Sequence, residues 1–163
     1  MQKILLLICT WIPIGLSAQQ DDSLRSDSIP PLNLKILEFV QSKIGKKVDR
    51  GECWDLAAQA LDLAGATWNH QYKFGKLLEL ETDTIYPGDI IQFERVKLKY
   101  VKNGITFHEE MKHHTAIIYE VLGKGAYTLA HQNTGFSGKK VGLSPIDLET
   151  LKRGRIKLYR PIK

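Results

Sequence analysis

The spacing of hydrophobic residues changes once along the chain, and this change constrains the fold more than any other feature. Up to Gly65 hydrophobic side chains recur at helical spacing. This pattern predicts one helix over residues 33–45 and a second that starts at Gly51 or Glu52 and runs through Leu63. Further along, the hydrophobic residues fall in short runs typical of strands. Helices followed by strands indicate an α+β domain, with N-terminal helices packed on an antiparallel sheet.

The predicted element ends follow from short local patterns. Asn33 is a suitable N-cap for the first helix, and Asp49 with Glu52 has the spacing of a capping box for the second. Lys102-Asn103-Gly104 predicts a hairpin turn, because Asn-Gly is the strongest short hairpin signal. Ser144-Pro145 predicts the start of a short helix that ends near Gly154, before a last strand.

One strand is expected to lie inside the sheet. Residues 115–122 (TAIIYEVL) carry too few polar side chains to face water on one side. We therefore expect this strand to be central. Gly123-Lys124-Gly125 then turns the chain into a partner strand over Tyr127–His131.

The first residues resemble an export signal. Lys3 precedes an apolar run from Ile4 to Ile14, and small residues follow up to Ala18. This is the pattern of a secretory signal peptide, which predicts cleavage after Ala18 and an exported protein, periplasmic or extracellular. We therefore divide the chain into a signal peptide (1–18), a flexible lead-in (19–32) and one domain (33–163). No later stretch is apolar enough to predict a membrane span.

Composition excludes some partners. The 163 residues are 43% hydrophobic and 25% charged, which is ordinary for a globular domain, and the formal net charge is +5. Lysines and arginines are scattered without interleaved aromatic residues, so we expect no nucleic-acid partner. The mild positive charge suits anionic surfaces such as cell-wall polymers. We expect a monomer.

Cys53 is the only cysteine outside the predicted signal peptide. An exported protein with a single thiol leaves three interpretations: an intermolecular disulfide, a buried inert cysteine, or a reactive one. Cys53 lies in the first turn of the second predicted helix, where the helix dipole lowers a thiol pKa. This position favours a nucleophile.

Two histidines and one asparagine are candidate partners of Cys53. His114 directly precedes the predicted central strand, and His131 ends the partner strand, with Asn133 two residues later. Across the intervening hairpin these residues can meet. We therefore expect Cys53 to attack, His114 to act as base and then acid, and His131 or Asn133 to orient the His114 ring. His113 remains the alternative base, and a turn role remains open for Asn133.

Four ordered motifs resemble those of the papain-like CHAP and NlpC superfamily: Gly51-x-Cys53, Pro87-Gly88-Asp89-Ile90-Ile91, His114-Thr115-Ala116-Ile117-Ile118 and Gln132-Asn133. The resemblance implies a papain-like fold, in which N-terminal helices pack on an antiparallel sheet or half-barrel. It also implies a cysteine amidase or endopeptidase. CHAP domains have Glu-Gln-Asn where this chain has His131-Gln132-Asn133, but NlpC-type enzymes use His at the third catalytic position.

The sequences of four longer segments are similar to those of another family with the same fold. These segments are GECWDLAAQAL, YPGDIIQFE, HHTAIIYEV and LKRGRIKLYRPI. They resemble the cysteine-proteinase-fold domain at the C-terminus of a fungal myosin tail region-interacting protein, and its bacterial relatives. The resemblance covers about residues 35–163.

The sequence thus predicts an exported cysteine hydrolase that cleaves amide bonds in peptidoglycan stem peptides or in protein peptides. The alternative is a catalytically inactive domain that binds a peptide or cell-wall fragment in the same groove, and a third interpretation is an inhibitor or effector directed at neighbouring cells. Cys53 and the histidines also offer zinc ligands, but no HExxH or CxxC spacing is present. We expect no metal and no cofactor.

Overall fold

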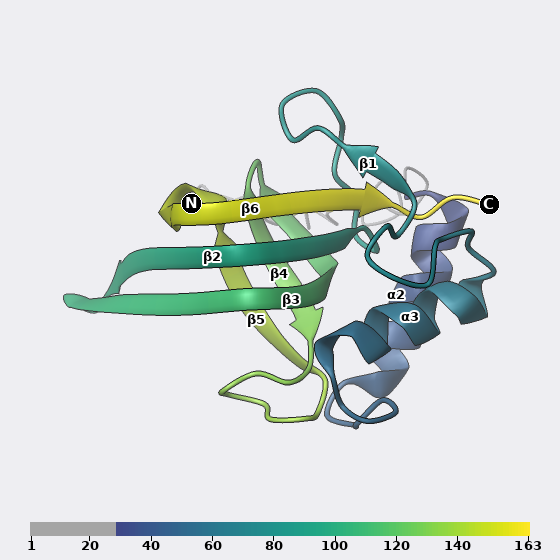
Figure 1. Cartoon of the computed structure of the whole chain (residues 1–163), viewed down its shortest axis with the longest axis horizontal. Helices are drawn as coiled ribbons and strands as arrows, with labels where there is room; N and C mark the ends of the chain where they lie inside the picture. Colours follow the sequence, from purple (N-terminus) through teal and green to yellow (C-terminus); the bar gives the residue numbers. More distant parts are fainter. Residues whose placement is uncertain (1–28) are drawn as a thin grey trace, which may run out of the picture.

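A computed structural model describes residues 29–163 (Figure 1). Two helices come first, α2 (Pro31–Lys43) and α3 (Cys53–Ala64). The strands are β1 (Lys76–Leu78), β2 (Ile90–Lys102), β3 (Ile105–Gly123), β4 (Ala126–His131), β5 (Gly142–Asp147) and β6 (Leu151–Arg160), and a 3₁₀ helix, η1 (Leu148–Thr150), joins the last two. The predicted α+β class is confirmed. The predicted signal peptide (1–18) and most of the lead-in (19–28) lie outside the described residues.

The six strands form one antiparallel sheet in the order β1-β6-β2-β3-β4-β5. Strand β3 lies between β2 and β4, which confirms that residues 115–122 belong to a central strand. The short strand β1 and strand β5 form the two edges. In Figure 1, β4 and β5 cross behind β2 and β3, so the sheet is strongly curled, and the β2–β3 hairpin extends away from the helices.

The predicted turn at Asn103-Gly104 is confirmed. Lys102 pairs with Ile105 across the hairpin, so the turn has two central residues. Both have positive φ angles, 51° for Asn103 and 75° for Gly104. This is the requirement of a type I′ turn, whose twist matches that of the two strands.

The sheet separates two hydrophobic cores. One core lies between the helices and the sheet, and its sheet residues include Ile90 and Ile117. The other lies on the opposite, curled face and includes Phe93, Ile118 and Tyr127. These five side chains are at most 1% exposed, and complete burial of one such aliphatic or aromatic side chain contributes about 1.5–3 kcal/mol. Helix α3 is therefore fixed against the middle of β3.

Helix α2 begins two residues earlier than predicted, so Pro31 and Leu32 belong to the helix and not to the lead-in. Pro31 occupies the first helical turn, where its missing N–H has no cost, and no side chain caps this end. Asn33 is therefore not the N-cap. Its side chain is fully buried and donates from Nδ2 to Asp89 Oδ1 (2.7 Å) and to Pro87 O (3.0 Å).

Asp89 ties three distant segments together. Besides Asn33 on α2, its carboxylate accepts hydrogen bonds from Arg160 Nε (2.6 Å) and Nη2 (2.9 Å) at the end of β6, and from Tyr86 N (2.9 Å). The preceding Gly88 has a φ of 87°, and a Cβ there would lie 2.6 Å from Asn33 O. The Pro87-Gly88-Asp89 turn is thus a buried tether that fixes the start of β2 against α2.

The prediction of a short helix after Ser144-Pro145 is wrong. These residues lie in strand β5, where Ser144 pairs with Leu129 and Pro145 pairs with Thr128 of β4. Strand β5 is an edge strand, and an edge tolerates proline because its outward-facing positions need no N–H donor. Gly154, expected near the end of that helix, lies inside β6 with a φ of 101°.

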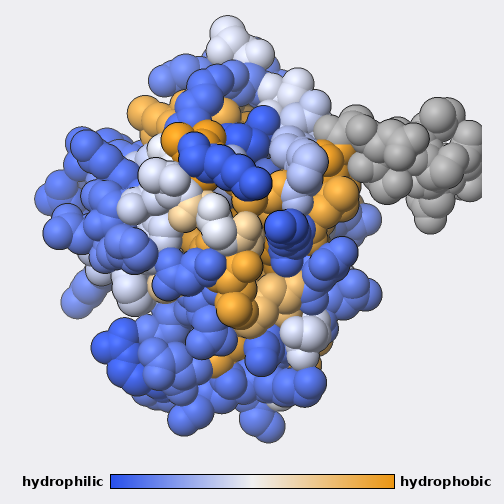
Figure 2. Space-filling view, turned by 90° about the vertical axis from the view of Figure 1, so that its right-hand side faces the viewer, coloured by the Kyte–Doolittle hydropathy of each residue, from blue (hydrophilic) through white to orange (hydrophobic). Residues whose placement is uncertain are grey.

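The surface of the described residues is mostly polar on the side that carries the helix ends. Figure 2 shows this side, where hydrophobic residues form a band between larger hydrophilic areas. Leu63 near the end of α3 is 68% exposed. Neither α2 nor α3 is long and apolar enough to cross a membrane.

Candidate active site

Cys53 is the first residue of α3, as the sequence predicts, but the capping residues differ from the prediction. Glu52 is the N-cap, and it forms the capping box with Asp55 rather than with Asp49. The Asp55 carboxylate accepts from Glu52 N (3.0 Å), and its other oxygen is bound by Arg50 Nη2. The box is therefore shifted by three residues, which places Cys53 at the N-terminus of the helix.

The Cys53 thiol is free and half-buried. Burial raises its pKa above the ordinary value, because an ionised sulfur loses hydration there. Hydrogen bonds from the backbone N–H groups of Thr115 and Trp54 lower the pKa, and the Glu52 carboxylate raises it again. The net shift is upward. The N–H groups at the helix start lower the Cys53 pKa, as expected, but burial outweighs their effect.

Glu52 is held to one side of the helix start by two partners. Its carboxylate accepts from Lys139 Nζ (2.9 Å) and Asn133 Nδ2 (2.6 Å). These contacts draw the carboxylate toward the segment that follows β4. They do not remove its charge from the neighbourhood of Cys53, which is why it still raises the thiol pKa.

Thr115 lies on the part of β3 that extends beyond the end of β4. Ile117 pairs with Ala130, so a longer β4 would bring residue 132 opposite Thr115. Ile118 directs its N–H to Asp89 beside β2, and alternation then turns the Thr115 N–H toward the β4 side. Because β4 stops at His131, this donor is available to the Cys53 sulfur.

His114 and His131 form a buried hydrogen-bonded pair. His114 Nε2 and His131 Nδ1 are 2.8 Å apart, and the rings are 8% and 7% exposed. His131 Nε2 lies 2.8 Å from Ser144 Oγ on β5. Burial lowers the pKa of His114 to about 4, with His113 adding to the effect. Burial lowers the pKa of His131 to about 3, with His114 adding to it. Both rings are therefore neutral near pH 7.

His113 and His114 lie on opposite faces of β3. Ile117 packs in the helix-side core, whereas Ala116 packs in the core on the curled face. Side chains alternate along a strand, so His113 shares the helix side with Ile117 and His114 shares the curled face with Ala116. The His114 ring accordingly lies near Phe93, with centroids 6.3 Å apart.

His113 has partners of a different kind. Its ring is exposed, meets the edge of Tyr72 with centroids 4.2 Å apart, and lies 3.2 Å from Gln92 Nε2. No hydrogen bond joins either histidine ring to the Cys53 sulfur among residues 29–163. The sulfur instead contacts the backbone of Thr115, which directly follows His114.

Asn133 does not reach the His114 ring. It has a φ of 62°, and its side chain donates to Glu52. The turn role that the sequence left open for Asn133 is the one that this geometry favours. The preceding Gln132 is fully buried and bonds Val48 through both its oxygen (3.1 Å) and its nitrogen (3.0 Å), and Glu52 O (2.8 Å). Gln132 thus fixes the chain that leads into Cys53.

The described residues offer no evident metal centre. Among residues 29–163, no three His, Cys, Asp or Glu side chains are grouped closely enough to hold an ion.

The AIM3/BBC1 cysteine proteinase-fold domain family matches residues 32–163. The chain belongs to this family. Its resemblance to the cysteine-proteinase-fold superfamily, inferred from the motifs around Cys53 and His114, is thereby confirmed. The finer assignment to NlpC or CHAP domains stays a prediction.

A relative of this AIM3/BBC1 domain is Altered inheritance of mitochondria protein 3 from Debaryomyces hansenii. It is 28% identical over an alignment of 145 residues, and the match covers 78% of this chain but only 15% of that protein. The crystal structure of Ly7917 with the hydrolyzing product of MDP is similar, with a TM-score of 0.51, 15% identity, and coverage of 79% of this chain and 62% of that chain. A second crystal structure of Ly7917 has a TM-score of 0.48, with 15% identity and coverage of 78% and 62%. These structural similarities concern the fold alone.

Ser144 is the site residue of this cysteine proteinase-fold domain that sequence reasoning missed. The Ser-Pro pair resembles a helix start, and that pattern hides a hydroxyl that faces His131. Strand β4 ends at His131 and β5 begins at Gly142, so the long connection between them gives no hairpin signal for their pairing. Pairing β5 with β4 brings Gly142 opposite His131, so Ser144 lies two residues further along the strand.

Proposed function

We propose that this chain is an exported cysteine hydrolase that cleaves an amide bond in a peptide, either a peptidoglycan stem peptide or a segment of protein. The observation that carries the proposal is the junction at Thr115. The Thr115 backbone N–H lowers the pKa of the Cys53 thiol and so lies beside the sulfur, and the preceding residue is His114, whose ring is hydrogen-bonded to His131. A nucleophile at a helix N-terminus therefore lies beside the residue that follows an oriented histidine, and the proposed reaction requires the His114 ring to reach the sulfur from the curled face of β3.

Two tautomers satisfy the histidine chain, and the proposed reaction requires one of them. If His114 Nε2 carries the proton and donates to His131 Nδ1, then His131 Nε2 carries its own proton and donates to Ser144 Oγ. This arrangement leaves the lone pair of His114 Nδ1 free. Nδ1 has no partner among residues 29–163, and the only sealed side-chain polar atom without a partner in that range is Asn33 Oδ1. Nδ1 therefore keeps contact with solvent and is available as a base.

In the proposed reaction, Cys53 Sγ attacks the carbonyl carbon of the scissile amide while His114 Nδ1 takes the thiol proton. The Cys53 backbone N–H at the start of α3 donates to the oxyanion that forms. His114 then gives its proton to the departing amine, which leaves a thioester on Cys53. Water, deprotonated by His114, attacks the thioester, releases the carboxylic acid and restores the thiol. No atom or electron beyond those of substrate and water is needed.

The pKa shifts indicate a resting state with a neutral thiol and a neutral ring. Burial disfavours each charge separately, but the two opposite charges stabilise each other once the proton has moved. The pair is therefore formed during the reaction rather than before it. Catalytic contacts of this kind are often long without substrate and tighten when it binds.

A second candidate function is a catalytically inactive domain that binds a peptide or cell-wall fragment. The raised pKa of Cys53 and the lack of a hydrogen bond from its sulfur to an imidazole favour this alternative. The surface around Cys53 would then bind a peptide without cleaving it.

Cleavage assays with matched variants separate these functions. Purified sacculi and a defined mixture of protein peptides are incubated with wild type, Cys53→Ala, His114→Gln and His113→Gln, and products are identified by mass spectrometry. We expect wild type to release products, Cys53→Ala and His114→Gln to lose at least about 10³-fold in rate, and His113→Gln to stay close to wild type.

Each other outcome has a defined meaning. Equal cleavage by Cys53→Ala would refute the nucleophile, and loss of activity in His113→Gln but not in His114→Gln would move the base to the helix face. No cleavage by wild type, with peptide binding retained in Cys53→Ala, would establish the binding domain instead.

The proposed export and the proposed monomeric state are tested by separate experiments. Export predicts that the mature chain begins at Gln19, which N-terminal sequencing of the secreted protein measures. We propose that the mature chain is a monomer, and sedimentation gives its mass. Ly7917 was crystallised with the hydrolyzing product of MDP. That is one reason to include MDP among the substrates assayed.

A further inference from the structure

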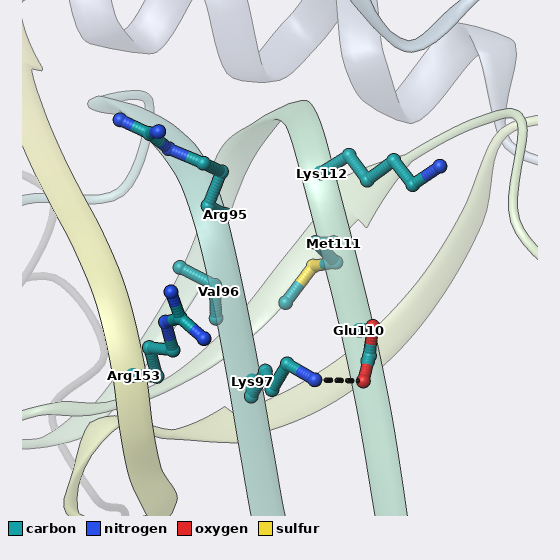
Figure 3. A pocket seen from close by; sticks show the side chains of 7 residues that line it. All are labelled: Arg95, Val96, Lys97, Glu110, Met111, Lys112 and Arg153. Atoms are coloured by element: carbon teal, nitrogen blue, oxygen red, sulfur yellow. Dashed lines mark hydrogen bonds and ion pairs between the residues drawn. The ribbon is translucent and has the colours of Figure 1, made fainter.

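A basic pocket lies on the sheet where β6, β2 and β3 run side by side. Its volume is about 220 Å³. The lining residues are Arg95, Val96, Lys97, Glu110, Met111, Lys112 and Arg153 (Figure 3). Neither the cysteine site nor the motifs of the family assign it a role. It is smaller than the 300–1,000 Å³ of a typical small-molecule site, so it suits one chemical group of a larger molecule.

A bulge in β2 builds this pocket. The pairing of β2 with β6 shifts between Glu94 and Lys97, so two residues of β2 face the single residue Gly154. Arg95 has a φ of 52°, which is uncommon for a residue other than glycine. Gly154 has a φ of 101°, and a Cβ there would lie 2.5 Å from Arg95 O. Two unusual backbone conformations thus bring the strands together at this point, as often happens beside functional sites.

The bulge places cations without partners around an apolar floor. Val96 is 1% exposed and Met111 is half-buried between the strands. In Figure 3, Arg153 reaches from β6 toward Val96, whereas the Arg95 and Lys112 side chains point in opposite directions away from the centre of the pocket. Arg95, Lys112 and Arg153 form no salt bridge within residues 29–163.

The one carboxylate of the pocket is already engaged. Glu110 Oε1 is bound by Lys97 Nζ at 2.5 Å. That hydrogen bond lowers the pKa of Glu110, and the charges of Lys97, Lys112 and Arg153 lower it further. Two of the three cations without a salt-bridge partner, Lys112 and Arg153, therefore lie close to Glu110, and the pocket keeps an excess of positive charge.

Two neighbouring cations on the same strand share one carboxylate, so a smaller excess of positive charge remains there than in the pocket. Arg155 and Lys157 of β6 both pair with Glu94, at 3.1 and 2.8 Å. Arg153 is two residues away on the same strand and has no such partner. The arginine therefore has its planar set of donors available for an anion with several acceptor oxygens.

We propose that this pocket binds a phosphate group, with Arg153 as its main contact and Arg95 and Lys112 supplying further positive charge. A phosphate carries close to two negative charges and three strong acceptor oxygens, whereas a carboxylate would neutralise only one of three free cations. The apolar floor of Val96 and Met111 then contacts the organic part that bears the phosphate. The phosphate belongs either to a soluble molecule or to a lipid headgroup.

The test uses the intact mature protein and two probes at 0.15 M salt. Inorganic phosphate is titrated against wild type with chloride as the reference anion, and chemical shifts of the backbone amides of residues 95–97 and 111–112 are followed by NMR. Vesicles of phosphatidylglycerol and of phosphatidylcholine are tested by co-sedimentation. Arg153→Gln removes the main contact, and Arg155→Gln is the matched control because its charge is already paired.

We expect phosphate to shift these amides, and Arg153→Gln to weaken binding about tenfold, as loss of a hydrogen bond to a charged group does. Arg155→Gln should stay within about twofold of wild type. Binding of free phosphate identifies a soluble source, and Arg153-dependent binding to phosphatidylglycerol vesicles identifies a lipid headgroup. The proposal is overturned if neither probe binds, or if both arginine variants weaken binding equally.

Discussion

Mild acid should destabilise this fold before its carboxylates are protonated, because His114 and His131 are buried in their neutral form. Their pKa values in the folded state are about 4 and about 3. In the unfolded chain both rings titrate near 6.5. The unfolded state therefore binds more protons below that pH. The stability that the neutral rings contribute is fully present above about pH 6.5 and is lost as the pH falls toward their folded values.

The magnitude follows from the two sets of pKa values. At pH 5 the protonated form of an unfolded ring with a pKa of 6.5 outnumbers the neutral form about thirtyfold, while the folded rings are still mostly neutral. The difference is about 2 kcal/mol for each ring, or about 4 kcal/mol for the pair, relative to pH 7. A domain of this size has a total unfolding free energy of about 5–15 kcal/mol. Acidification to pH 5 should therefore remove a large share of it.

Urea unfolding at pH 7, 6 and 5, followed by tryptophan fluorescence, measures this loss. The double variant His114→Gln/His131→Gln should show little change across this range, and the exposed control His108→Gln should behave like wild type. If the double variant does not fold, an NMR titration of the two rings in wild type provides the same test. A wild-type unfolding free energy that changes by less than about 1 kcal/mol between pH 7 and pH 5 would refute the reasoning.

Three further predictions concern the tether and the thiol. Asp89→Asn should cost about 3 kcal/mol or more of unfolding free energy in urea, because Arg160 loses its charged partner, and a wild-type midpoint would contradict this. Gly88→Ala should destabilise by about 2–4 kcal/mol through its φ of 87° and its close contact with α2; Gly45→Ala, with a φ of 76° and nothing within 4 Å, should cost only about 1 kcal/mol, and equal losses would exclude the contact as the cause. Alkylation of Cys53 by iodoacetamide should follow an apparent pKa above about 8.5, because burial raises it, and a midpoint near 7 would show that the thiol is activated at rest.

Much of the fold could be predicted from the sequence because local rules agreed with the tertiary structure. Asn103-Gly104 specifies its turn by backbone preference alone, and the apolar run that begins at residue 115 is buried on both faces through Ile118. The two helices also followed from hydrophobic spacing. These features depend on nearest neighbours or on simple burial, which a single sequence displays directly.

Local patterns failed where a distant partner decides the structure. Asn33 has the side chain of a cap, but Asp89, 56 residues away, takes its hydrogen bond. Ser144-Pro145 looks like a helix start, but pairing with β4 makes it a strand. Both errors concern polar residues whose best partner comes from another element, which no window of sequence contains.

The candidate site shows the same division. Position alone placed Cys53 at a helix start and brought His114 near His131, and the structure has both arrangements. The pKa of the thiol depends on burial by surrounding elements, so the sequence could suggest only the lowering effect of the helix. The choice between His113 and His114 also depends on which face of β3 meets the helices. The sequence does not show this, because both faces of β3 pack in hydrophobic cores.

The composition of the two edge strands has a consequence for self-association. An incoming strand would find only three residues to pair with along β1, and on the other side it would meet Pro145, which lacks an N–H. Two copies of this chain therefore cannot easily join their sheets into a longer one. A concentrated solution of the protein should remain free of fibrils as long as its sheet stays intact.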